Sequence, residues 1–204
     1  MHLRHSIAIF ALAFLAMAPQ SWAQTCEQSG PAFCGLCGFG SAYNLMKDGG
    51  FDYDCNPAVW SFGPHTYRSS PSGSISSCGV WPPPPWPPPF AQVDGPTNGW
   101  AFFWQDTPAR VESGYGSHFS FGYTIEINDS NASNQVYVEI IDLNTNEHWG
   151  VDYVTGAHSC ETRNSSLGDH PNWRGHTLRV QFDTSLVNSA SVKVEGVNFW
   201  QSSY

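Results

Sequence analysis

Apolar and polar residues alternate one by one over long stretches in the second half of the chain. In the segment 118–127, the apolar positions are Phe119, Phe121, Tyr123, Ile125 and Ile127, with polar or small residues between them. The same alternation returns in the segments 136–140 and 177–182. A period of two with one apolar side predicts a β-strand that covers a core with that side. We therefore expect a strand in each segment.

The last apolar run changes its phase part-way. Val192 and Val194 share one parity, whereas Val197 and Phe199 have the other, and Gly196 lies between the two pairs. One extra residue at a β-bulge would turn the later pair back toward the core. The pattern predicts a single strand with a bulge at Gly196.

The connections between these strands are polar and short. Residues 128–134 and 144–146 are rich in Asn, Asp, Ser and Thr, and no segment of the chain has a helical period. Such residues favour turns. Several antiparallel strands joined in this way predict an all-β protein, a two-sheet antiparallel β-sandwich. Asn128, Asn131 and Asn164 also begin N-glycosylation sequons, where we expect surface turns.

Residues 68–99 have no clear period, and we expect irregular structure there. Their centre is a Pro-rich loop at 81–89, in which proline cannot donate the hydrogen bonds of a helix or a central strand. Such a run favours the polyproline II conformation. It could be a surface spacer or a ligand for a proline-binding domain.

Residues 1–23 have the layout of a secretory signal peptide. Arg4 and His5 precede an apolar run at 7–18, and small residues at 21 and 23 suit signal peptidase. A membrane anchor is the alternative, but the apolar run is too short to span a bilayer comfortably, and no other stretch is apolar enough. We expect a secreted, extracellular protein without membrane insertion, whose mature chain begins near Gln24.

The cysteines follow the predicted signal peptide, at Cys26, Cys34, Cys37, Cys55, Cys78 and Cys160. An even number in a secreted chain indicates three disulfide bonds, whose pairing the sequence leaves open. A metal or redox site at Cys34 and Cys37 is the alternative. We expect residues 24–43 to form an irregular, Cys-rich extension before a β-sandwich domain at 44–204.

Two segments at opposite ends of this domain resemble one family. The first runs from Asn44 to Asp52 and is followed by Trp60, and the second joins 178–183 to 190–199. Together with a middle segment at 109–121, they resemble the carbohydrate-binding modules that have a galactose-binding-like β-jelly-roll fold. The resemblance implies a jelly-roll sandwich and a polysaccharide or glycan as partner. The net charge of −9 separately disfavours nucleic acids and anionic membranes.

The resemblance also implies a structural Ca²⁺ that ties the first strand to the last. Carried over by position, its carboxylate ligands would be Asp52 and Glu195. Calcium prefers six to eight oxygen ligands, which two carboxylates and loop carbonyls could supply. Asp52 stands where the family often has Glu, and Glu195-Gly196 where it often has Asp-Asp or Asp-Asn. The alternative is that both residues are ordinary surface acids.

Sugar rings present apolar C–H faces and a rim of hydroxyl groups, which suit aromatic and polar side chains respectively. The chain has nine tryptophans, of which Trp22 lies in the signal peptide, and a core of this size cannot bury all the others completely. Exposed aromatic side chains indicate contact surfaces. We expect Trp60, Trp100 and Trp200 in the core. The candidate ligand contacts are Trp104, Gln105, Arg110, Tyr115, Trp149, Tyr153, Trp173 and Arg174.

Catalysis is the competing interpretation. A pair of carboxylates can hydrolyse a glycosidic bond, and Glu126 and Glu139 both point outward from predicted strands that could pair as a hairpin. The chain has neither a GxSxG nor an HExxH motif. We expect a secreted, non-catalytic carbohydrate-binding protein. The alternatives are a small polysaccharide-degrading enzyme (a glycoside hydrolase or lyase) and an extracellular structural or adhesive protein.

Overall fold

The computed structural model describes residues 44–46, 49, 51, 59–69, 90–110 and 115–203. These residues form ten strands and a 3-10 helix, η2 (Pro171–Trp173). The strands are β1 (Ser61–Phe62), β2 (Thr66–Ser69), β3 (Phe90–Asp94), β4 (Ala101–Pro108), β5 (Tyr115–Ile127), β6 (Gln135–Asp142), β7 (Glu147–Thr155), β8 (His158–Asp169), β9 (Thr177–Ser185) and β10 (Ser191–Ser203). The strands predicted from the alternation are therefore confirmed as parts of β5, β6, β9 and β10. The prediction that 68–99 is irregular is wrong for the end of β2 and for β3, which has only two inward apolar residues, Ala91 and Val93.

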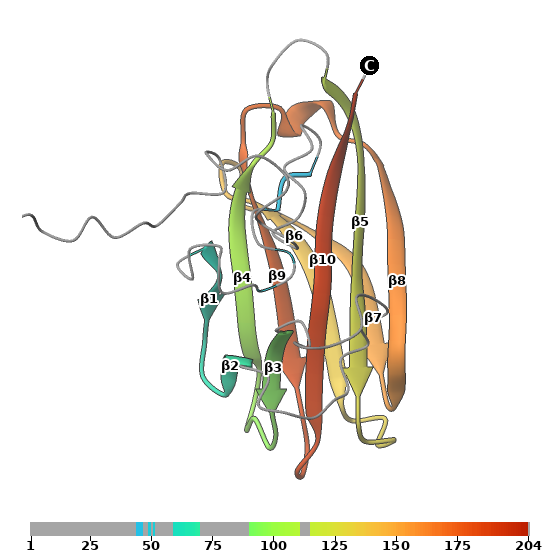
Figure 1. Cartoon of the computed structure of the whole chain (residues 1–204). Coiled ribbons are helices and arrows are strands. Elements are labelled where there is room, and N and C mark those ends of the chain that lie inside the picture. Colours follow the sequence, from blue (N-terminus) through green and yellow to red (C-terminus); the bar gives the residue numbers. More distant parts are fainter. Residues whose placement is uncertain are drawn as a thin grey trace, which may run out of the picture.

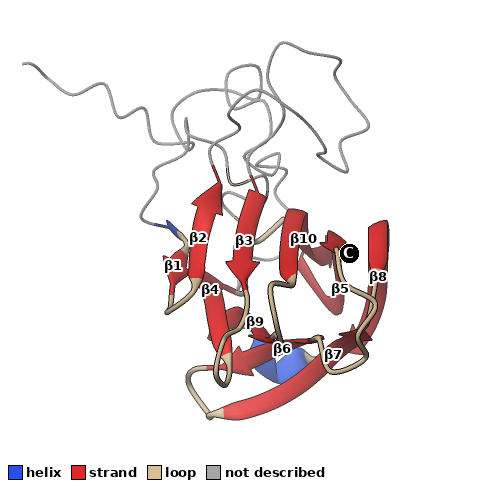
Figure 2. Ribbon diagram, turned by 90° about the horizontal axis from the view of Figure 1, so that it is seen from below, coloured by secondary structure: helices blue, strands red, loops and turns tan. Residues whose placement is uncertain are grey.

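The strands form two antiparallel five-stranded sheets, each named here after its central strand. The β9 sheet has the order β1-β4-β9-β6-β7, and the β10 sheet has the order β2-β3-β10-β5-β8 (Figure 1). Seen from below, the two sheets lie as separate layers (Figure 2). The predicted two-sheet antiparallel sandwich is confirmed.

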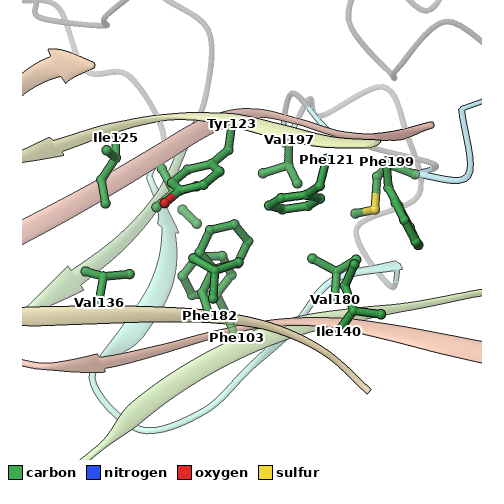
Figure 3. Packing of buried hydrophobic residues seen from close by; sticks show 14 of the residues in the cluster. Phe103, Phe121, Tyr123, Ile125, Val136, Ile140, Val180, Phe182, Val197 and Phe199 are labelled. Carbon is green, nitrogen blue, oxygen red and sulfur yellow. The ribbon is translucent and has the colours of Figure 1, made fainter. Parts of the chain in front are cut away.

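Aromatic side chains from both sheets fill the space between the layers. Phe121 and Tyr123 point from the β10 sheet toward Phe103 and Phe182 of the β9 sheet (Figure 3). The rings of Phe103 and Phe182 stack with centroids 4.8 Å apart, and Tyr123 meets Phe182 edge-on at 5.2 Å. Burial of these rings supplies much of the hydrophobic stabilisation of the domain.

The bulge predicted at Gly196 is confirmed. The register between β10 and β5 shifts between Glu195 and Asn198, and Gly196 has a φ of 61°. Glycine adopts this left-handed conformation without a steric penalty. Val194 and Val197 are both buried as a result, although their separation is odd.

The opening segment of the domain lies along the closing strand. Asn44 forms a β-bridge with Trp200, and the backbone N–H of Leu45 donates to the carbonyl of Phe199 at 2.7 Å. The side-chain Oδ1 of Asn44 accepts hydrogen bonds from the backbone N–H groups of Met46 and Phe199. Further along, the backbone N–H of Val197 donates to the carbonyl of Gly49. The two motifs that carry the family resemblance therefore lie side by side.

Several sequence predictions fall outside the described residues. These are the signal peptide at 1–23, the extension at 24–43, the Pro-rich loop at 81–89 and all cysteines except Cys160. Cys160 is disulfide-bonded. Among the described residues, no helix has the length and apolar character needed to cross a membrane.

Candidate functional site

The outer face of the β9 sheet carries a dense set of aromatic and polar side chains. In β9, the inward residues Leu178, Val180 and Phe182 are fully buried, so the residues between them point outward. The same alternation applies in β4 and β6. The outward side chains are Phe102, Trp104 and Asp106 of β4, Arg179, Gln181 and Asp183 of β9, Tyr137 and Glu139 of β6, and His148 and Tyr153 of β7. We call this set the β9 face.

Strand register arranges the β9 face in rows. One row crosses the sheet as Trp104, Gln181, Glu139 and Gly150, and the next as Phe102, Asp183, Tyr137 and Tyr153. Residues directly opposite on neighbouring strands have side chains in contact range. The rows therefore place polar groups in the middle of the face and aromatic rings toward both sides.

On the β4 side, Trp104 is held between another ring and a cation. Its ring centroid lies 5.5 Å from that of Phe102, and the guanidinium of Arg179 lies 5.1 Å from the Trp104 ring. Arg179 donates from Nε and Nη2 to the two carboxylate oxygens of Asp106, at 2.7 and 3.0 Å. A two-bond contact of this kind fixes the plane of the guanidinium. Trp104 is consequently restrained in orientation while it remains partly exposed.

The middle of the β9 face is a hydrogen-bonded network. The Nε2 group of Gln181 donates to Glu139 at 3.3 Å and to both oxygens of Asp183, at 3.0 and 3.2 Å. His148 Nδ1 lies 3.0 Å from the other carboxylate oxygen of Glu139. Burial and the neighbouring Glu139 raise the pKa of Asp183 above its usual range, although the hydrogen bond from Gln181 opposes this effect. The network presents both donors and acceptors in fixed positions.

On the β7 side of the face, two tyrosines lie next to a glycine, Gly150. Tyr153 is 53% exposed and pairs across the strands with Tyr137. The hydroxyl of Tyr137 occupies the space that a Cβ atom at Gly150 would need. Gly150 therefore lets the Tyr137 ring lie across β7, and the two tyrosines offer adjoining aromatic surfaces.

Comparison with known proteins finds solved structures that share this β-sandwich fold. No family model matches the chain, and no curated protein sequence matches it. Among solved structures, TmCBM61 in complex with beta-1,4-galactotriose has a TM-score of 0.55 at 10% identity, covering 78% of this chain and 99% of that one. The chain has the β-sandwich fold of a carbohydrate-binding module. At this identity, the likeness shows the fold alone.

Two further solved structures match this module fold less closely. Arabinose-bound MgGH51 α-L-arabinofuranosidase has a TM-score of 0.49 at 10% identity, covering 78% of this chain and 26% of that chain. A mutant of CBM29-2, a family 29 carbohydrate-binding module, has a TM-score of 0.44 at 10% identity, covering 71% of this chain and 77% of that one.

Within the module fold, the predicted ligand contacts divide into separate places. Trp104 and Tyr153 share the β9 face. Gln105 follows Trp104 in β4 and points inward, where it is 1% exposed. Its neighbour Trp104 is outward for the same reason, the alternation of the strand.

The other predicted contacts gather at one end of the sandwich, around η2. Trp173 is 1% exposed and packs against Trp149 and His170, with centroids 4.9 and 3.9 Å apart. Arg174 donates to the backbone carbonyl of Tyr115, which is itself 8% exposed. The remaining member, Arg110, lies over the Tyr115 ring at 5.8 Å. The prediction that Trp173 and Tyr115 are exposed is wrong, because the turn at η2 folds Trp173 over the end of the core.

The predicted core tryptophans also differ from one another. Trp60 is buried against Phe51 and Phe103, as expected. Trp100 is 52% exposed, because Ala101 takes the inward position at the start of β4. Trp200 follows the inward Phe199 and is therefore directed to the outer face of the β10 sheet, where it is half-buried. Burial in the core is wrong for both.

The carboxylates proposed for catalysis do not meet. β5 and β6 lie in different sheets, so the predicted hairpin between Glu126 and Glu139 is wrong. Glu126 instead contacts Lys193 at 3.4 Å. The carboxylate beside Glu139 is Asp183, which was not predicted from the sequence. The alternation in β9 predicts that Asp183 points outward. It does not predict that β9 pairs with β6, which is what brings Asp183 next to Glu139.

Glu195 is not an ordinary surface acid. It is 9% exposed, and its Oε2 atom has no hydrogen-bond partner. Burial and, to a smaller extent, the charge of Glu126 raise the pKa of Glu195 to about 7. Its predicted calcium partner Asp52 lies outside the described residues. Within those residues, no group of three or more His, Cys, Asp and Glu side chains could hold a metal ion.

Proposed function

We propose that the protein binds a polysaccharide or glycan chain on the β9 face without cleaving it. The observation that carries this proposal is the arrangement of the face, in which partly exposed rings flank a fixed polar network. Aromatic rings can stack on the apolar faces of sugar rings, while the network groups of Gln181, Glu139 and Asp183 can exchange hydrogen bonds with hydroxyl groups. Polar groups held in advance cost little ordering entropy on binding.

The width of the face supports a chain rather than a single sugar. Trp104 on β4 and Tyr153 on β7 are separated by β9 and β6. Neighbouring strands lie about 4.8 Å apart, so the two rings are separated by roughly 14 Å across the sheet. A single sugar ring cannot reach both. The face therefore suits an oligosaccharide that lies across the strands.

The test is a pull-down on insoluble cellulose, mannan and galactan, with reducing-sugar release measured on the same samples. We expect binding to at least one polysaccharide without release. Trp104→Ala and Tyr153→Ala should each weaken binding at least tenfold, as expected when an aromatic anchor is truncated. The matched control is Tyr67→Ala, which removes an exposed ring from the β10 sheet. Equal loss in the control, or no binding at all, would contradict the proposal.

A second candidate function is glycoside hydrolysis by Glu139 and Asp183. The observation that favours it is the raised pKa of Asp183 beside a second carboxylate, since a general acid needs such a shift. The reducing-sugar assay decides between the two functions. Release by the wild type that is lost in both Glu139→Gln and Asp183→Asn, while each variant remains folded, would establish the enzyme.

Two further proposals are that the protein is secreted and that it contains three disulfide bonds. The features of residues 1–23 and the six cysteines support a secreted protein with three disulfide bonds; Cys160 is disulfide-bonded in the structure. Intact-mass measurement before and after reduction and alkylation would count the bonds, and an alkylated cysteine in the unreduced sample would contradict full pairing.

We also retain the proposed structural Ca²⁺ at Asp52 and Glu195. The unpartnered Oε2 of buried Glu195 fits a hard cation, which prefers carboxylate oxygen. Its position also fits, since Glu195 immediately precedes the bulge beside which Gly49 contacts Val197. Such an ion would stabilise the joined ends of the domain and take no part in sugar binding.

A further inference from the structure

The outer face of the β10 sheet contains a hollow of about 260 Å³. Its outward lining residues are Ser120, Asn164, Ser166, Asn198 and Trp200, from three neighbouring strands. They lie on the opposite side of the sandwich from the β9 face. We call this hollow the β10 pocket.

A buried glycine beside the pocket lets two of the lining side chains approach each other. Register places Asn164, Gly122 and Asn198 in one row across β8, β5 and β10. A Cβ atom at Gly122 would lie 2.5 Å from Oδ1 of Asn164 and 3.0 Å from Oδ1 of Asn198. The two amide groups therefore converge over Gly122, in space that any other residue would fill.

The adjoining row provides hydroxyl groups and an aromatic wall. It consists of Ser166, Ser120 and Trp200, again across β8, β5 and β10. Every residue that lines the pocket is uncharged. Amides and hydroxyls can each donate and accept hydrogen bonds, which suits a ligand with several hydroxyl groups. The indole of Trp200 can contact an apolar ring face.

We infer that the β10 pocket binds one neutral sugar ring, at the end or at a branch of a glycan. A volume near 260 Å³ lies just below the range for drug-sized ligands, which suits a single ring better than a chain. The lack of charge disfavours acidic or amino sugars. The pocket is a binding site in its own right and does not depend on the β9 face.

Together with the proposed function of the β9 face, the pocket would make one domain bivalent. The two sites face away from each other, so one glycan chain lying flat on one face cannot reach the other. The protein would then link separate chains, and its avidity for a dense polysaccharide would exceed its affinity for a short oligosaccharide.

A Ser-His-Asp row at the rim does not make the pocket catalytic. Ser166 Oγ lies 3.2 Å from Nε2 of His118, but Nδ1 of His118 lies 3.6 Å from Asp169. The His118 and Asp169 side chains are 51% and 72% exposed. An acyl-transfer triad needs a buried Asp that is hydrogen-bonded to the histidine. The row instead holds the hydroxyl of Ser166 at the edge of the pocket.

The test is an NMR titration of the full, disulfide-bonded chain with three probes, methyl β-galactoside, methyl β-glucoside and methyl α-mannoside. The protein is made in a bacterial periplasm, because Asn164 begins a sequon and lies exposed in β8. We expect at least one probe to shift the indole signal of Trp200 and the side-chain amide signals of Asn164 and Asn198. Gly122→Val and Trp200→Ala should each weaken this response at least tenfold, while Trp104→Ala should leave it unchanged.

The outcomes separate this inference from the proposed function. Shifts confined to the β9 face, or no shifts with any probe, would overturn the pocket. In the first of these cases the β9 face would stand. Shifts in the pocket together with no polysaccharide binding that depends on Trp104 would support the pocket and contradict the proposed function. Unchanged dispersion of the backbone amide spectrum shows that Gly122→Val remains folded.

Discussion

The two outer faces of the sandwich are built on the same strand geometry but carry opposite chemistry. The β9 face has large rings at its sides and a centre of ionisable groups, with Glu139 and Asp183 bridged by Gln181. The β10 pocket is lined by uncharged side chains, with Trp200 as the only ring among its outward lining residues, and two of its amides cover Gly122. Large side chains cover the β9 face, whereas the outer face of the β10 sheet contains a hollow. The outward positions of each sheet can therefore specialise independently of the core that supports both.

The inward positions show why this independence is possible. Phe182 of β9 and Phe121 of β5 are both almost completely buried, and their rings lie 6.2 Å apart. Each strand therefore contributes one side to a shared core and one side to a face of its own. Function on such a fold resides in the outward residues. The two faces should respond together to damage in the core and separately to every other change.

The largest expected effect comes from the shared core. Phe182→Ala should lower the free energy of unfolding by about 3–5 kcal/mol, because it leaves a cavity where Phe182 contacts Phe103 and Tyr123. Denaturant unfolding measures this effect. Both faces should lose binding at the same temperature as the variant unfolds. Leu143→Ala, at a 40% exposed position, is the control and should change stability little. Loss of binding on one face only would contradict the claim that both faces depend on one shared core.

A smaller effect should separate the faces. Asn44→Ala removes the oxygen that accepts hydrogen bonds from the buried N–H groups of Met46 and Phe199, at an expected cost of about 1–3 kcal/mol. Because Asn44 pairs with Trp200, the β10 pocket should weaken more than the β9 face. Asn128→Ala is the matched control, since it removes a similar acceptor for Ser191 at an exposed site. Equal effects of the two variants would show that the opening segment does not support the pocket.

Calcium should act on one side of the sandwich. If Glu195 and Asp52 hold an ion, saturating Ca²⁺ at about ten times its dissociation constant should add about 1.4 kcal/mol to the stability of the domain. Thermal melting with Ca²⁺ and with a chelator measures this difference. Glu195→Gln should abolish it without changing polysaccharide binding by the β9 face. An identical calcium effect in wild type and Glu195→Gln would remove Glu195 from the site.

The smallest expected effect is a pH dependence of the β9 face. Burial and Glu139 raise the pKa of Asp183, so the folded protein favours the protonated carboxyl. The stability that this preference contributes is present below the ordinary Asp pKa and is lost as the pH rises through the raised pKa. Asp183→Asn should therefore stabilise the protein by less than about 1 kcal/mol at pH 7.5 and not at about pH 3.5.

Urea unfolding at the two pH values measures this difference. Polysaccharide binding by the β9 face should also vary less with pH in Asp183→Asn. Binding in the β10 pocket should change less between these two pH values than binding by the β9 face, because every residue that lines the pocket is uncharged. A stabilisation by Asp183→Asn that is equal at both pH values would contradict the role of ionisation.

The positions of the strands could be predicted from the sequence better than the pairing between the strands. The alternation in β5, β6 and β9 and the bulge at Gly196 depend on local residues, so they could be found from the chain alone. β8 has polar residues on both sides, including the inward Arg163, which binds Asp152, so it shows no apolar alternation. Which strands pair depends on contacts far apart in the sequence. For that reason Glu126 and Glu139 were predicted together but lie in different sheets.

The site residues show the same limit. Trp104 and Tyr153 point outward because of the strand period, and they share the β9 face. Trp173 could not be placed in this way, since its burial depends on the turn of η2 over the core. Gly122 gave no signal in the sequence, because the need for a glycine arises only when Asn164 and Asn198 lie on either side of it.

The bridge between Asn44 and Trp200 bears on how the domain could be connected to other proteins. It brings the point where the chain enters the sandwich next to the strand by which it leaves. A domain whose two connections are close together can be inserted into a surface loop of a host protein without stretching that loop. The β9 face and the β10 pocket both lie on the broad sides of the sheets. A graft made at this junction would leave the β9 face on the far sheet exposed, whereas the β10 pocket, which Trp200 lines, would lie beside the host.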